Sequence, residues 1–244
     1  MIRLVLVVLF LVIFLLISIP IQFVLWLIGK KNLDGAKKAS LVIVSAAFKV
    51  VQFLSGVKLT VIGEENVPKD TPVLYIGNHR SYFDIVVTYS RVPRLTGYIA
   101  KKEILKVPVL SMWMKFLDCL FLDRKDIRQG LEVILSAIDK VKNGISITIF
   151  PEGTRNSSDE ILQPFHKGSF KIAQKTGCPI IPVTLNNTNA IFEDHPWSIK
   201  RSHVIIEYGK PIYVKDLPKE DQKNIDMICY DIIKETYIKN KELV

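Results

Sequence analysis

Residues 72–84, "PVLYIGNHRSYFD", place an apolar run directly before a cluster of polar residues. The run at 72–77 has the length and composition of a buried strand. Ser81 and Asp84 then match the S-x-x-D pattern that begins a helix with a carboxylate in its first turn. The stretch therefore predicts a strand that passes through a short loop into a helix, which is the unit from which α/β domains are built.

His79 and Asp84 are five residues apart in this stretch. Within one helix that spacing would turn the two side chains about 140° away from each other, so they would not meet. They can meet if His79 lies in the loop and the helix begins immediately after it. The stretch alone leaves two roles open for Asp84. It caps the helix and complements the helix dipole, or it also fixes the imidazole tautomer and supports positive charge on the ring.

The rest of the chain alternates strand-like and helical patterns. Helices are expected at 107–117, 127–144, 168–177 and 220–241, and further strands at 120–122, 145–150, 179–185 and 202–209. This order predicts an α/β domain over residues 57–244, with a largely parallel core sheet flanked by helices. In such sheets the ligand site lies beyond the carboxyl ends of the strands.

Residues 1–56 are predicted to be membrane-anchoring helices. No charged residue occurs from Leu4 to Ile28, and a helix of that length, at about 1.5 Å per residue, would cover a hydrocarbon layer roughly 30 Å thick. A cleaved signal peptide is the alternative, but this run is longer than the apolar core of a signal peptide and ends in lysines. Residues 41–56 are apolar but contain a lysine and a glutamine. They fit an amphipathic or re-entrant helix at the membrane interface, or an ordinary core helix.

The net charge of +9 is concentrated in the first half of the 244 residues. Residues 30–128 contain 17 Lys and Arg against 9 Asp and Glu. A basic region beside a membrane segment favours anionic lipid headgroups or phosphorylated substrates as partners. Nucleic acid is not expected, because no interleaved aromatic residues or nucleic-acid motif accompany the charge. The linker lysines favour a cytoplasmic position; they are Lys30, Lys31, Lys37 and Lys38.

Neither a metal nor a cofactor is expected from the sequence. The three cysteines are odd in number and scattered, which implies no disulfide framework and no zinc site and fits a reducing compartment. Three further histidines are isolated and are interpreted as surface or packing residues: His166, His195 and His203.

A second strand also ends in a polar cluster. In residues 145–156, "ISITIFPEGTRN", a β-branched run leads into a proline, a carboxylate, a glycine, a hydroxyl and an arginine. Gly153 permits a tight turn, and Arg155 offers a planar guanidinium that suits phosphate oxygens. If this strand runs parallel to the one at 72–77, both polar clusters lie at one edge of the sheet. The pattern then predicts a base and a phosphate-binding group side by side.

With both clusters in view, the chain resembles the 1-acyl-glycerol-3-phosphate acyltransferases of the wider glycerolipid acyltransferase family. Four blocks of that family are matched, in order, over roughly residues 57–210. They are N-H-x4-D (Asn78, His79, Asp84), a lysine-containing acceptor block ("GYIAKKEI", with Lys101 and Lys102), F-P-E-G-T-R (residues 150–155) and an apolar strand with proline ("PIIPVTL", 179–185). The N-terminal apolar helices are also typical of the family.

The resemblance implies roles for the matched residues. His79 would be the general base and Asp84 would hold it oriented, since imidazole has an unperturbed pKa of roughly 6.5. Ser81 as a covalent nucleophile is the weaker alternative, because no G-x-S-x-G pattern is present. The expected substrate-binding residues are Asn78, Lys101, Lys102, Glu152, Gly153, Thr154 and Arg155. Of these, a lysine and Arg155 would bind the acceptor phosphate, and residues 152–154 would shape the loop.

The implied activity is transfer of a fatty acyl chain from acyl-CoA or acyl-carrier protein to the 2-hydroxyl of lysophosphatidate, which gives phosphatidate. We expect the domain on the cytoplasmic face of a membrane, such as a bacterial inner membrane, with membrane lipid as a further partner. Three alternatives stay open at this point. They are another acceptor (glycerol-3-phosphate, a lysophospholipid or an acylated amino acid), hydrolysis of the acyl thioester, and a non-catalytic membrane-surface protein.

Overall fold

A computed structural model describes residues 1–244, and its centre is one seven-stranded sheet with the order β1-β7-β6-β2-β5-β3-β4. The strands are β1 Lys58–Ile62, β2 Leu74–Gly77, β3 Thr96–Lys101, β4 Leu120–Leu122, β5 Ser146–Ile149, β6 Ile180–Asn186 and β7 His203–Tyr208. All neighbouring strands pair in parallel except β6 and β7, which are antiparallel. The predicted α/β class with a largely parallel sheet is confirmed.

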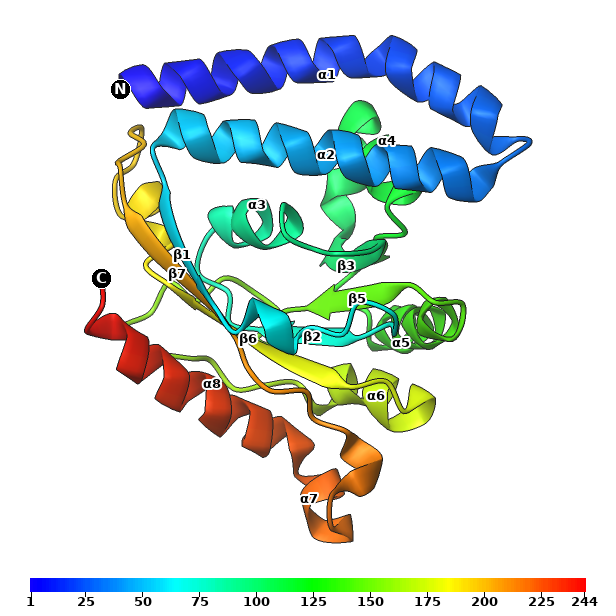
Figure 1. Ribbon diagram of the computed structural model, residues 1–244, viewed down its shortest axis with the longest axis vertical. Helices are drawn as coiled ribbons and strands as arrows, with labels where there is room; N and C mark the ends of the chain where they lie inside the picture. The colour runs from blue at the N-terminus through cyan, green and yellow to red at the C-terminus, as the bar shows by residue number, and fades with distance from the viewer.

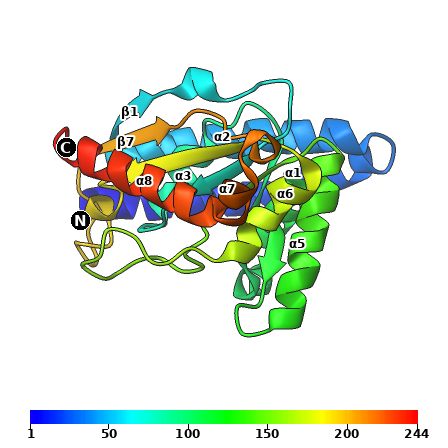
Figure 2. The same ribbon diagram turned by 90° about the horizontal axis from the view of Figure 1, so that it is seen from below.

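The helices lie on both faces of the sheet (Figures 1 and 2). They are α1 Ile2–Gly29, α2 Leu33–Ser55, α3 Phe83–Tyr89, α4 Pro108–Phe116, α5 Ile127–Lys142, α6 Lys171–Thr176, α7 Lys219–Lys223 and α8 Ile225–Lys241. Helices α5, α6 and α8 bury apolar side chains against one face, around Ile76, Ile147 and Ile180. Helix α3 packs on the other face, and Val87 of that helix lies among sheet residues such as Tyr75 and Val183.

The two N-terminal helices form an antiparallel hairpin that lies across the outside of α3 and α4 (Figure 1). Helix α2 buries a stripe of small and apolar residues, among them Ala36, Val44 and Val51. Helix α1 lies outermost, and polar contacts fasten it to α4. Gln22 donates to the Val109 carbonyl at 2.7 Å, and the Trp113 indole donates to Ser18 Oγ at 2.8 Å. Both helices are long and apolar enough to cross a membrane by length and composition, but in this fold they pack side by side along the domain.

The second apolar segment proves to be part of a longer helix than its hydropathy indicates. Helix α2 begins at Leu33, because the Asn32 side chain accepts a hydrogen bond from Gly35 N at 2.8 Å and caps it. Its first turns contain charged residues. Lys37 forms an ion pair at 2.7 Å with Asp118, a buried aspartate that also pairs with Lys140 of α5 at 2.6 Å. The helix therefore buries one face on the domain and exposes apolar residues such as Val42 on the other.

Candidate active site

The two polar clusters meet at the carboxyl edge of the sheet, because β2 and β5 are parallel neighbours. His79 follows β2 directly, and the segment 150–155 follows β5. Backbone hydrogen bonds join the two loops. His79 N donates to Glu152 Oε1 at 2.7 Å, and Asn156 N donates to the His79 carbonyl, also at 2.7 Å. The structure therefore places the imidazole and the arginine-containing loop at one site.

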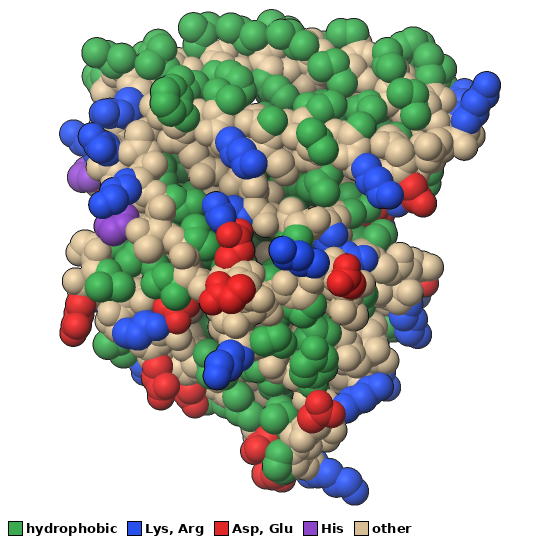
Figure 3. Space-filling model, in the orientation of Figure 1, with side chains coloured by type: hydrophobic (Ala, Val, Ile, Leu, Met, Phe, Trp, Pro, Cys, Tyr) green, Lys and Arg blue, Asp and Glu red, His purple; other side chains and the backbone are tan.

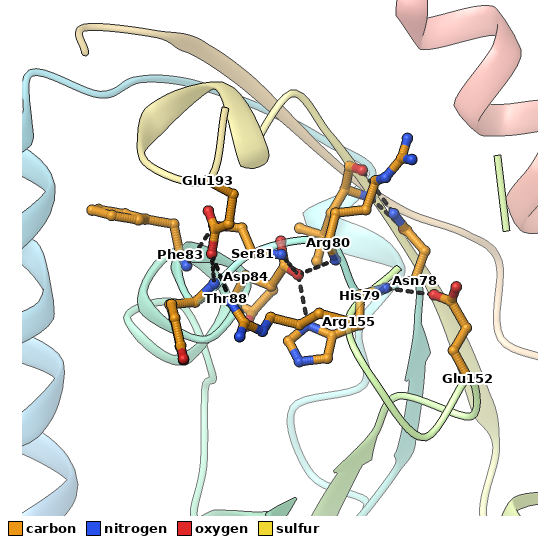
Figure 4. Close-up of polar contacts among 12 residues, drawn as sticks. Asn78, His79, Arg80, Ser81, Phe83, Asp84, Thr88, Glu152, Arg155 and Glu193 are labelled. Carbon is orange, nitrogen blue, oxygen red and sulfur yellow. Dashed lines mark hydrogen bonds and ion pairs between the residues drawn. The ribbon is translucent and has the colours of Figure 1, made fainter. Parts of the chain in front are cut away.

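His79 and Asp84 form a hydrogen-bonded pair. His79 Nδ1 lies 2.7 Å from Asp84 Oδ2 (Figure 4), and the Asp84 side chain is fully buried. The same oxygen accepts hydrogen bonds from Arg80 N at 2.7 Å and Ser81 N at 2.8 Å. The loop between β2 and α3 makes this contact possible, since His79 precedes the helix and Asp84 lies in its first turn. Asp84 therefore both caps α3 and holds the histidine.

The contact with Asp84 determines which ring nitrogen of His79 is free to act. A carboxylate only accepts, so in the neutral ring the proton lies on Nδ1, and Nε2, directed away from Asp84, has the lone pair. The ring stacks on Phe150 with 4.2 Å between centroids, and His79 is only 8% exposed. A neutral imidazole with one oriented basic nitrogen is the arrangement that general-base catalysis requires.

Asn78 and Glu152 face into the protein rather than toward the site opening. The fully buried Asn78 side chain exchanges two hydrogen bonds with the backbone of Leu185 in β6, at 2.8 and 2.9 Å. Glu152 accepts from the backbone N–H groups of His79 and Gln163 at 2.7 and 2.8 Å. Burial raises the pKa of Glu152, and these two hydrogen bonds oppose the rise. Figure 4 shows Glu152 and Asp84 on opposite sides of His79, so both residues position the histidine.

Gly153 allows the loop after β5 to turn tightly. Its φ is 72°, and a Cβ at this position would lie 3.1 Å from His166 Nε2. The conformation and the closeness of the His166 ring therefore favour glycine. Thr154, the next residue, is exposed. The two residues lie at the outer part of the loop and lead the chain to Arg155, and their role in substrate binding stays a prediction.

Arg155 is held by a residue that the sequence analysis missed. Its guanidinium forms an ion pair with Glu193 at 3.1 Å and stacks over the Tyr82 ring at 3.7 Å from the centroid. Glu193 also accepts hydrogen bonds from Ser81 Oγ at 2.6 Å and Tyr82 N at 2.8 Å. Glu193 lies beyond β6, and no local pattern distinguishes it from other surface carboxylates. Only the fold brings it beside the first turn of α3.

Lys101 ends β3 at the same edge of the sheet and Lys102 begins the short helix that follows it, but neither contacts His79 or Asp84. Lys101 lies 3.5 Å from Glu103, and Lys102 pairs with Asp123. Both lysines are exposed. A further cation, Arg124, follows β4, where partial burial lowers its pKa, Glu103 raises it and Arg155 lowers it. Arg155 and Arg124 are thus near enough to interact, and the lysines lie at the margin of this basic edge.

Taken together, the α/β sheet has a buried His–Asp pair and a basic margin at its carboxyl edge, a geometry that suits an enzyme site. Comparisons with known proteins identify the family. Residues 58–186 match the model of the Acyltransferase family. The 1-acyl-sn-glycerol-3-phosphate acyltransferase of Borreliella burgdorferi is 33% identical over 196 residues, which cover 80% of this chain and 78% of that relative. The chain belongs to this acyltransferase family.

Two further relatives are similar over most of the chain. The 1-acyl-sn-glycerol-3-phosphate acyltransferase of Saccharomyces cerevisiae is 32% identical over 80% of this chain and 63% of its own length. The crystal structure of the 1-acyl-sn-glycerophosphate acyltransferase PlsC from Thermotoga maritima superposes with a TM-score of 0.79, over 97% of this chain and 96% of that one, at 24% identity. That similarity includes the N-terminal hairpin and confirms the fold.

Proposed function

We propose that the protein transfers a fatty acyl chain from an acyl thioester to the 2-hydroxyl of 1-acyl-glycerol-3-phosphate, giving phosphatidate. The observation that carries the proposal is the 2.7 Å contact between His79 Nδ1 and the buried Asp84. It leaves one basic nitrogen at the edge of the sheet, beside an arginine. The relatives are 1-acyl-sn-glycerol-3-phosphate acyltransferases, which supports this acceptor, and either acyl-CoA or acyl-carrier protein would supply the acyl group.

The chemistry needs one base and no covalent enzyme intermediate. His79 Nε2 takes the proton of the acceptor hydroxyl as its oxygen attacks the thioester carbonyl. Collapse of the tetrahedral intermediate breaks the carbon–sulfur bond, and the imidazolium returns the proton to the departing thiolate. The Asp84 carboxylate stabilises the imidazolium between these two steps. Each turnover therefore regenerates neutral His79.

A cavity behind Phe150 offers space for an acyl chain. It has a volume of about 480 Å³, and its lining includes Tyr75, Tyr98, Val183 and Tyr208 together with charged side chains such as Glu64 and Arg91. Phe150, which stacks on His79, also lines it. Pockets of this size and apolar character suit lipid-like ligands. We assign the cavity to the fatty chain of a substrate whose reacting end lies at His79.

An acceptor panel tests the proposed activity directly. Purified protein is supplied with acyl-CoA or acyl-carrier protein and with lysophosphatidate, glycerol-3-phosphate, a lysophospholipid or water alone. We expect thiol release that depends on lysophosphatidate and a product with the mass of phosphatidate. Thiol release at the same rate without any acceptor would instead indicate a thioester hydrolase. Faster transfer to another acceptor would reassign the substrate within the same chemistry.

Arg155 is proposed to bind the acceptor phosphate, because its guanidinium lies beside the histidine loop and can bond phosphate oxygens in a bidentate manner. Arg155→Ala is expected to lower kcat/KM for lysophosphatidate by about 10- to 100-fold, because losing a hydrogen bond to a charged group has an effect of this size. Arg155→Lys should recover only part of it. Steady-state kinetics with lysophosphatidate and with monoacylglycerol, which lacks the phosphate, measure the effect.

The neighbouring arginine provides a matched control. The Arg80 guanidinium bonds to Tyr237 Oη and to the carbonyls of Ser158 and Glu160, away from the proposed phosphate site. Arg80→Ala should lower stability more than acceptor specificity. If Arg155→Ala reduces activity on both acceptors by the same factor, the side chain maintains the loop. Phosphate binding would then be reassigned to Arg124 or to Lys101 and Lys102, at and just after the end of β3.

We further propose that the N-terminal hairpin places the protein on the cytoplasmic face of a membrane. Almost the whole outer face of α1 is apolar and exposed, including Leu9 and Leu16. Figure 3 shows this apolar surface as a continuous cap, with basic side chains gathered beneath it. Because α1 runs along the domain, it would lie in one leaflet of the bilayer, and the basic side chains below it would meet the headgroups.

Polar substitutions on this cap test the location. Leu9→Gln combined with Leu16→Gln should lower the fraction of protein retained on membranes, since each change removes exposed apolar surface from lipid. The matched control is Ile127→Gln with Leu131→Gln, two exposed residues on α5 at the far side of the sheet. The control should leave retention unchanged. Equal losses in the two variants would argue against α1 as the membrane-facing element.

A further inference from the structure

The loop between the short helix η4 (Asn189–Ile191) and β7 contains an exposed tryptophan in an unusual conformation. Trp197 is 82% exposed, and its backbone φ is 66°. For a bulky residue this left-handed conformation is an outlier, and such outliers gather at functional segments. Packing within the domain does not explain why this large aromatic side chain is exposed to solvent.

The loop lies beside the open end of the N-terminal hairpin. Ile191 and Ile199, which flank Trp197, are buried in one cluster with Val7 of α1 and Val51 of α2. In Figures 1 and 2 the segment rises next to the N-terminus of α1. Trp197 is therefore displayed next to the apolar cap rather than on the opposite side of the domain.

Cations lie in this segment and beside the end of α2, and one exposed carboxylate, Asp194, accompanies them. A Cβ on Gly56, at the end of α2, would lie 3.0 Å from Arg3 Nε and 3.5 Å from Arg201 Cβ, so these two arginines converge there. Lys200 is exposed in the same segment. Tryptophan is enriched where the hydrocarbon layer of a membrane meets water, and clustered Lys and Arg beside it attract anionic headgroups.

We propose that residues 194–201 form a second membrane contact, in which Trp197 enters the interfacial region of an anionic phospholipid surface while Lys200 and Arg201 lie at the headgroups. The inference rests on the proposed membrane location of α1. The loop lies near the membrane only if α1 does, because Ile191 and Ile199 of the loop pack in one cluster with Val7 of α1. The continuity of the loop with the apolar cap and the positive charge identify lipid as the occupant.

This contact would bring the membrane close to the catalytic residues. Glu193, four residues before Trp197, holds Arg155 and Ser81. A lipid acceptor that leaves the bilayer at the loop would therefore be close to Arg155, the proposed phosphate-binding residue, because Arg155 is bonded to Glu193 at the start of the loop. Binding of the loop to the phospholipid membrane would therefore also bring the lipid acceptor close to the active site.

Tryptophan fluorescence in vesicles tests the proposal. Full-length protein is bound to vesicles of anionic phospholipid with and without bromine on the acyl chains, and the quenching of wild type is compared with that of Trp197→Phe. The difference isolates Trp197 from Trp26 and Trp113. We expect the Trp197 emission to be strongly quenched by brominated lipid. Phenylalanine is a conservative replacement, because it keeps an aromatic side chain on the same backbone.

A relocated tryptophan gives the matched control. Tyr213 is exposed next to η5 (Val214–Asp216), on the side of the sheet opposite α1. Tyr213→Trp in the Trp197→Phe background should show no additional quenching. If wild type binds vesicles but its Trp197 emission is not quenched, the second contact is refuted while the membrane location stands. If the protein does not bind vesicles at all, both proposals fail.

Charge substitution tests the headgroup part of the inference. Lys200→Gln with Arg201→Gln should weaken binding to anionic vesicles by about fivefold per charge at low salt, the effect of a cation near such a surface. Binding to vesicles of zwitterionic lipid should not change. The same loss on both vesicle types would overturn the placement of these cations at the headgroups.

Discussion

His79→Ala is expected to lower kcat by on the order of 10²–10⁴, because general-base catalysis contributes a factor of that size. The change removes the only imidazole that is bonded to a buried carboxylate and stacked beside the arginine loop. Rates of thiol release and of phosphatidate formation measure the loss. The protein should remain folded and bound to membranes, since Asp84 Oδ2 keeps its hydrogen bonds from Arg80 N and Ser81 N.

His166 provides the matched control for that result. Its ring lies beside Gly153 in the same region, but it is exposed and no carboxylate accepts a hydrogen bond from it. His166→Ala should keep kcat within a few-fold of wild type. A folded His79→Ala protein with near-normal acyl transfer would refute the proposed mechanism. A loss of acyl transfer in both the His79→Ala and the His166→Ala variants would indicate damage to the loop rather than loss of a base.

Local pattern indicated the condition under which His79 and Asp84 can meet. The apolar run ends at Gly77, a helix can begin only after Ser81, and five residues then suffice for a carboxylate to turn back toward the histidine. The sequence left open whether Asp84 is a cap or a catalytic partner. In the structure one oxygen makes both contacts, because Oδ2 accepts from the backbone and from the imidazole, and the catalytic role of Asp84 stays a prediction.

Orientation was the part of the site that the sequence did not reveal. Asn78 and Glu152 stand in motifs beside the reacting histidine, so their polar side chains suggest contact with substrate. In the fold they bond to backbone groups of Leu185, His79 and Gln163. Residue type indicates that a group must be paired when it is buried, but it does not indicate the partner.

Long-range pairing explains the remaining omissions. Strands β1 and β3 were not predicted. The partner of β1, strand β7, lies more than a hundred residues later, and the partners of β3, strands β4 and β5, also follow it in the chain. Glu193 was missed for the same reason. It follows β6 in the chain, and only the folded sheet brings it next to Ser81 and Arg155, which are far away in sequence. Periodicity reports which face of an element is buried, whereas contacts of this kind depend on topology.

Asp84→Asn separates the two roles of the carboxylate. An asparagine whose oxygen takes the place of Oδ2 can still accept from Arg80 N and Ser81 N, so the cap survives. In that orientation the contact with Nδ1–H also remains, but the negative charge that would stabilise the imidazolium is lost. We expect kcat to fall by on the order of 10²–10⁴ with little change in Tm.

Ser81→Ala is the complementary variant, since it weakens the cap and leaves the charge of Asp84 in place. Ser81 Oγ accepts from Phe83 N at 2.9 Å and donates to Glu193, so its removal should cost about 0.5–2 kcal/mol of stability while kcat stays within a few-fold of wild type. Abolished turnover in a folded Ser81→Ala protein would favour Ser81 as a nucleophile. If Asp84→Asn instead lowers Tm as Ser81→Ala does and leaves kcat intact, Asp84 is a cap alone. His79 would then have to act as a base without a charged partner.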